Sequence, residues 1–118
     1  IYVTYVAGIL RSVRFGAGEA HGVANMMCFN FMQDKGAFTR DAEGKYVIDI
    51  EKTTEAMNEW AALILKVEGD GAYDYAKEYA GERGKVRSDL QADLDKIAAA
   101  GIPRDITYNQ GLEALGLK

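Results

Sequence analysis

The sequence feature that most constrains the fold of this chain is the near absence of charge from its first third. The chain has 118 residues with 14 basic and 18 acidic side chains, yet residues 1–33 hold only Arg11, Arg14 and Glu19. A helix that is apolar nearly all round has to be covered on most of its sides. A chain this short has difficulty covering two such helices. We therefore expect residues 1–33 to pack against the remainder of a longer polypeptide or against a partner.

The composition excludes several broad classes of protein. A hydrophobic content of 48% against 27% charged residues excludes disorder, and no apolar run reaches the roughly 18 residues of a membrane-spanning helix. The net charge of −4 argues against a general nucleic-acid binder, because a basic excess is needed to displace phosphate counterions. We therefore expect a single globular domain with no nucleic-acid partner and no membrane partner.

The spacing of apolar residues predicts a mainly α-helical domain of about five helices with one small β-hairpin. We expect a buried helical pair over residues 1–36, a hairpin over 37–50, three helices over 51–100 and a tail over 101–118. The expected helices, in chain order, are residues 2–15, 19–35, 50–68, 72–80 and 85–100. No positively charged leader precedes an apolar stretch, and the start at Ile1 suggests that the chain begins partway through a longer protein.

Local signals mark several of these boundaries. Gly36 is placed as the C-terminal cap of the second helix, and Asp49 as the N-terminal cap of the third. Tyr46, Ile48 and Ile50 alternate, which predicts that they share one face of the hairpin.

His21 is the only histidine and the first candidate for chemistry. On a helix, Asn25 lies one turn further on, and Cys28 and Met32 continue the same stripe. As a site, this stripe offers hydrogen-bond donors to a cleft. As structure, His21 is a core histidine that bonds a carbonyl, and composition alone favours this second interpretation.

Other chemistries are poorly supported. A Cys28–His21 dyad fails because seven helical residues separate the two by roughly 10 Å, and Cys28 is better explained as a small buried apolar residue. No HExxH or CxxC motif suggests a metal, and Gly16-Ala17-Gly18 is not followed by the lysine of a phosphate loop.

Two further clusters have simple structural interpretations. The acidic residues Asp70, Asp74, Glu78 and Glu82 predict a solvated helix face, because the calcium-loop pattern is absent. The tyrosines Tyr73, Tyr75 and Tyr79 have no basic stripe beside them, so they predict packing rather than base stacking.

Two segments resemble the dipeptidyl peptidase III family of zinc exopeptidases. They are Arg14-Phe-Gly-Ala-Gly-Glu-Ala-His-Gly-Val-Ala-Asn-Met26 and Phe29-Asn-Phe-Met-Gln-Asp-Lys-Gly36. The hairpin, the Asp-initiated helix and the segment Glu68-Gly-Asp-Gly-Ala-Tyr-Asp-Tyr-Ala-Lys77 follow in the family's order. The resemblance covers about residues 10–85 and is weaker afterwards.

The resemblance implies a cytoplasmic metallopeptidase that removes dipeptides from the N-termini of peptide substrates. The family's zinc motifs, HExxGH and EExxA[ED], are absent from this chain. The resemblance therefore implies a C-terminal piece of the catalytic protein, with zinc in the full-length protein and none bound by these residues. It gives His21 the role of holding the peptide and stabilising the tetrahedral intermediate. It makes Asn25 a substrate-binding position, where family members carry an arginine.

An alternative from another class is a noncatalytic helical interaction domain. In that case residues 1–33 dock on a partner and His21 only packs. Some members of the family are fused to a nudix hydrolase domain on their N-terminal side, but this chain contains no nudix glutamate motif. Under either hypothesis, exposed apolar surface predicts self-association of the isolated chain.

Overall fold

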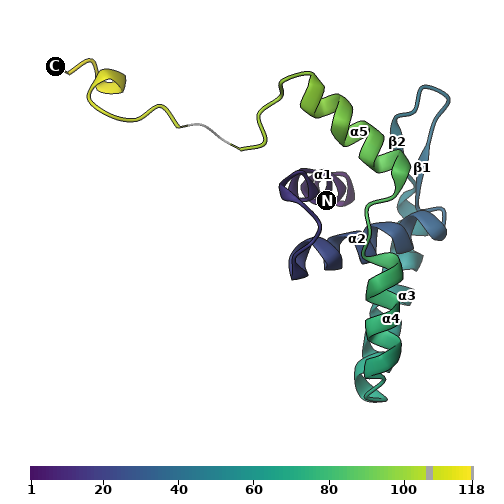
Figure 1. The fold of residues 1–118 in the computed structure, drawn as a ribbon. Helices are drawn as coiled ribbons and strands as arrows, with labels where there is room; N and C mark the ends of the chain where they lie inside the picture. The colour runs from purple at the N-terminus through teal and green to yellow at the C-terminus, as the bar shows by residue number, and fades with distance from the viewer. Residues whose placement is uncertain (106–107, 118) are drawn as a thin grey trace.

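The computed structural model describes residues 1–105 and 108–117, which form five α-helices and one two-stranded hairpin at the edge of the molecule (Figure 1). The elements in chain order are α1 (Tyr2–Ser12), η1 (Val13–Phe15), α2 (Ala20–Asp34), β1 (Phe38–Arg40), β2 (Tyr46–Ile48), α3 (Ile50–Gly69), α4 (Tyr73–Arg83), α5 (Ser88–Ala99) and η2 (Glu113–Leu115). The mainly α-helical class with one small hairpin is confirmed.

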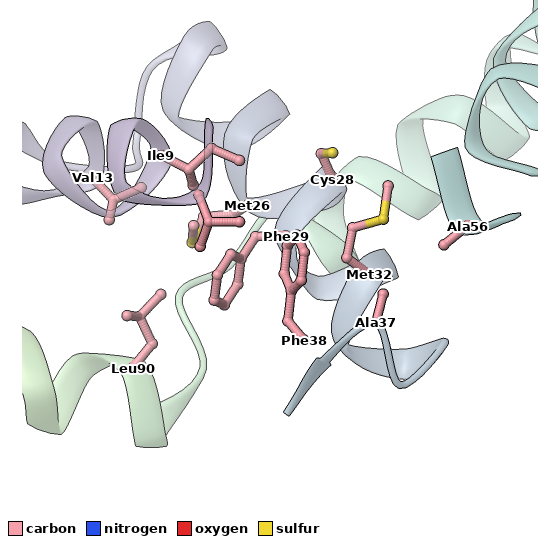
Figure 2. Close-up of a cluster of buried hydrophobic side chains, with 11 residues drawn as sticks. Ile9, Val13, Met26, Cys28, Phe29, Met32, Ala37, Phe38, Ala56 and Leu90 are labelled. Atoms are coloured by element: carbon pink, nitrogen blue, oxygen red, sulfur yellow. The ribbon is translucent and has the colours of Figure 1, made fainter. Parts of the chain in front are cut away.

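Helix α2 is the centre of the molecule. It contacts α1, α3, α4 and β1, and its Met26, Phe29 and Met32 are fully buried. Figure 2 shows side chains from the other elements converging on Phe29, including Leu90 of α5 and Phe38 of β1. The buried apolar core consists of Val6, Ile9, Val13, Met26, Cys28, Phe29, Met32, Ala37, Phe38, Ala56 and Leu90.

The hairpin packs on α2 through aromatic rings. Its strands are antiparallel, with Phe38 opposite Ile48. The rings of Phe38 and Tyr46 lie 5.5 and 5.7 Å from that of Phe29. Ile50, which was expected on the same face, is instead the first residue of α3 and is 55% exposed. The alternation ends because Asp49 caps the helix, accepting a hydrogen bond from the backbone N–H of Lys52.

Three predicted helix ends are wrong by a few residues. The first helix ends at Ser12 and tightens into η1, which closes at Gly16 with a positive φ of 112°. The fourth continues through Gly81 to Arg83, although glycine is a poor helix former. The fifth begins at Ser88 rather than at residue 85. Gly36 does follow the end of α2 with a φ of 70°, as predicted.

Within this chain, α1 is covered on one side only. Val6 and Ile9 are buried, whereas Ile1, Val3 and Tyr5 are exposed. The described residues therefore bury α2 but leave much of the apolar surface of α1 in solvent.

The molecule is elongated, with extents of 63 × 37 × 26 Å. Helices α3 and α4 pack together, α5 turns away from them, and the segment that follows α5 leads to a C-terminus far from the core (Figure 1). No helix among the described residues is long and apolar enough to cross a membrane.

Candidate functional site

His21 lies in the first turn of α2, two residues after a capping glutamate. The backbone of Glu19 is extended, and its carboxylate accepts hydrogen bonds from the backbone N–H groups of Gly22 at 2.8 Å and His21 at 3.1 Å. These two N–H groups have no partner within the helix, so the carboxylate satisfies them. The start of α2 is thereby fixed by a side chain two residues before the histidine.

The imidazole of His21 is in solvent and is paired with the same carboxylate. Its Nδ1 lies 3.2 Å from Oε2 of Glu19, and its side chain is 94% exposed. The core-histidine interpretation is therefore wrong for this chain. The backbone hydrogen bonds from His21 and Gly22, together with the ring contact, hold the pKa of Glu19 below its usual range.

The loop before the cap packs closely against α2. Gly22 is buried, and a Cβ placed there would lie 2.6 Å from Cα of Ala17 and 2.8 Å from the carbonyl oxygen of Gly16. Only glycine allows the loop and the helix to approach this closely. This close contact fixes the positions of Glu19 and His21 relative to η1.

Asn25, one turn after His21, points to α1. Its Nδ2 donates to Oγ of Ser12 at 2.6 Å, so the residue ties the end of α1 to α2. Cys28 is buried, as predicted, and its Sγ lies 3.2 Å from the Tyr5 hydroxyl. Burial raises the pKa of both groups. Because Met32 is fully buried and His21 is exposed, the predicted stripe does not form one continuous surface.

A groove of about 590 Å³ is lined in part by the Gly16–Ala17 loop. Its walls come from η1 and the loop, from α5, and from the segment after α5, including Arg14, Leu94 and Ile102. The guanidinium of Arg14 donates to the carbonyl oxygens of Ile102 and Pro103, and Arg104 donates back to the carbonyl oxygen of Arg14. His21 does not line this groove. The groove itself was not predicted from the sequence.

The acidic residues of the predicted solvated face are all exposed, but Asp70 is the C-cap of α3, and only Asp74, Glu78 and Glu82 lie on α4. No group of three or more metal-binding side chains occurs in the part of the chain that the structure describes. Tyr75 and Tyr79 lie 5.9 Å apart, and Tyr79 lies 6.1 Å from Trp60, so packing is confirmed for these two rings. Packing is wrong for Tyr73, which is 73% exposed.

Sequence reasoning missed the pairing of Glu19 with His21. The signal was present, because Glu19 is the only acidic residue in the first 33 positions. Glutamate is not among the usual N-cap residues, however, so its capping role was not expected.

The chain is similar to known proteins in sequence and in structure. No family model matches the chain. Over 107 residues it is 30% identical to Nudix hydrolase 3 of Arabidopsis thaliana, a match that covers 91% of this chain and 14% of that protein. The structure of dipeptidyl peptidase III from Caldithrix abyssi matches with a TM-score of 0.76 and 31% identity over 82% of this chain. The structure of dipeptidyl peptidase III from Corallococcus sp. strain EGB matches with a TM-score of 0.82 and 28% identity over 98% of this chain.

This chain resembles a region of dipeptidyl peptidase III. The helical arrangement is therefore that of a peptidase-related region. The chain spans only 19% and 21% of the lengths of these two structures, about one fifth in each case.

Proposed function

We propose that this chain is the part of a zinc-dependent dipeptidyl peptidase that supplies His21 to the reaction. The observation that carries the proposal is the exposed imidazole, held by Glu19 at the start of the central helix. The likeness to two dipeptidyl peptidase III structures supports peptide substrates and cleavage of dipeptides from their N-termini. The resemblance also implies action in the cytoplasm.

The proposed role of His21 is to donate a hydrogen bond to the negative charge that develops on the peptide carbonyl oxygen. Positioned donors of this kind act on the transition state more than on the bound substrate. Asn25 is the proposed substrate-binding partner. With one amide hydrogen donated to Ser12, its amide oxygen and second hydrogen remain to contact a peptide backbone.

The described residues do not fit a zinc site, since they bring together no set of three ligands. We propose that the zinc and its ligands belong to another part of the full-length protein. A metal of this kind polarises a carbonyl and activates water.

The test is His21→Ala in the full-length protein. We expect kcat for a dipeptidyl-naphthylamide substrate to fall on the order of 10²- to 10³-fold. The thermal midpoint should stay nearly unchanged, because substitutions at exposed positions usually have small effects on stability. Glu51→Ala, an exposed change in the first turn of α3, is the matched control and should leave kcat intact. Normal turnover in His21→Ala would overturn the assignment.

A noncatalytic interaction domain is the second candidate, and the exposed apolar side of α1 favours it. Under this hypothesis the full-length protein holds no stoichiometric zinc and hydrolyses no dipeptidyl substrate. Metal analysis after dialysis, together with the same activity assay, separates the two functions.

A further inference from the structure

The contact between Glu19 and His21 restricts where the imidazole can carry its proton. The carboxylate of Glu19 already accepts two backbone hydrogen bonds, which favour its ionised form. An ionised carboxylate has acceptors only. The Nδ1 atom, 3.2 Å from Oε2, must therefore bear a hydrogen for the contact to be attractive.

We propose that Glu19 is a positioning residue that holds His21 in the tautomer with the proton on Nδ1. In that tautomer Nε2 of the neutral ring is an acceptor. It becomes a donor only when the ring gains a second proton and is an imidazolium.

The catalytic consequence of this tautomer rests on the function proposed for His21. Donation from Nε2 to a developing oxyanion then requires the imidazolium form of the ring. Among residues 1–105 and 108–117, Glu19 is the charged side chain in contact with the ring. The neutral ring can still accept a hydrogen bond from a peptide N–H, but it cannot stabilise the oxyanion.

The tautomer can be measured without any activity. His21 is the only histidine, so the ring signals in a nitrogen-15 NMR spectrum of the uniformly labelled chain need no assignment. In the neutral ring we expect the Nδ1–H form to exceed the Nε2–H form by about fivefold, the scale of one modest hydrogen bond. A dominant Nε2–H form would overturn the proposal.

Glu19→Gln tests the cause. The glutamine carbonyl can still cap α2, but its amide can also donate to Nδ1, so both tautomers become acceptable. We expect the fivefold preference to fall to near equality, while Glu43→Gln, a change of an exposed glutamate in the hairpin turn, should leave the preference unchanged. An unchanged preference in Glu19→Gln would show that Glu19 does not set the tautomer.

The catalytic consequence has its own readout in the full-length protein. Relative to its value at acidic pH, the kcat of Glu19→Gln at alkaline pH should exceed that of the natural enzyme, because the neutral ring of the variant can donate from Nε2 and that of the natural enzyme cannot. Identical pH profiles would refute the imidazolium requirement. Normal turnover in His21→Ala would instead refute the proposed function, while the NMR result would still decide the tautomer.

Discussion

Asn30 shows how one buried side chain fixes the course of the chain far away in sequence. It is 2% exposed in the middle of α2, and its Nδ2 donates to the carbonyl oxygens of Arg83 at 2.7 Å and Lys85 at 2.9 Å. Arg83 is the last residue of α4 and Lys85 lies in the link before α5, so helical N–H groups do not reach these carbonyls. Asn30 supplies the missing donors and thereby sets the path between the two helices.

Replacing Asn30 by alanine should lower the free energy of unfolding by about 1 to 3 kcal/mol, because two part-buried hydrogen bonds to backbone carbonyls are lost. Denaturant unfolding measures the change. Asn109→Ala, in the exposed C-terminal segment, is the matched control and should stay within about 0.5 kcal/mol of the natural chain. Equal stabilities of the two variants would contradict the role of Asn30.

Gly22 and Gly81 provide a paired test of close packing. Both are helical glycines, but only Gly22 meets backbone within 3 Å, whereas nothing lies within 4 Å of a Cβ at Gly81. Gly81→Ala should stabilise the chain by about 0.5 to 1 kcal/mol through higher helix propensity. Gly22→Ala should destabilise it, because the Gly16–Ala17 loop must move. Thermal unfolding of both variants tests this, and a stabilised Gly22→Ala would show that the loop yields without cost.

At the scale of elements, ion pairs between charged side chains connect helices and strands in addition to the apolar core. Arg40 of β1 contacts Asp93 of α5 at 2.6 Å and stacks on Tyr46, with its guanidinium carbon 4.3 Å from the ring centre. Asp34, at the end of α2, pairs with Arg83 and Arg87 on either side of the α4–α5 link. Together these pairs hold α5 in place beside the hairpin and α2.

The Arg40–Asp93 pair makes stability depend on pH. The hydrogen bond from Arg40 lowers the pKa of Asp93, against the opposing effect of burial. The pair therefore stabilises the fold above the ordinary range of an aspartate, and this contribution is lost as pH falls through the lowered value. Asp93→Asn should reduce Tm at neutral pH, and the gap from the natural chain should narrow on acidification.

Asp95→Asn on the same helix is the control for this pH dependence, because its carboxylate accepts from the neutral side chain of Gln91. Its Tm should follow that of the natural chain at every pH. A gap for Asp93→Asn that stays constant from neutral to acidic pH would show that the ion pair does not contribute.

The sequence predicted the elements well and their long-range partners poorly. Apolar spacing, the Asp49 cap and Gly36 gave the helices and hairpin, because these signals act over a few residues. Asn30 interrupts an apolar pattern. The neighbouring residues do not indicate that its hydrogen-bond partners lie 53 and 55 positions away in the sequence. Composition alone favoured a buried His21, because charge-poor neighbours do not show which side of a helix is covered.

The whole molecule presents its apolar N-terminal side to solvent. Val3 is 63% exposed and Phe15 is 52% exposed. We expect the isolated chain to self-associate and to bind a hydrophobic dye, because such surfaces are usually covered. Sedimentation at several concentrations measures this. Val3→Glu should weaken association, whereas Val47→Glu on the hairpin, also at an exposed valine, should not. A chain that stays monomeric and silent with the dye would contradict the expectation.

The central position of α2 also has a consequence while the chain is being synthesised. α2 is made before α3, α4 and α5, and the Arg83 carbonyl that receives the Asn30 amide is made 53 residues after Asn30. At the usual rates of translation this delay is roughly 3 to 10 seconds, far longer than a helix needs to form. During that interval Phe29 and Met26 lack the cover that α5 later provides. On the ribosome, the most buried helix of the finished molecule is thus complete for several seconds before the elements that bury it have been made.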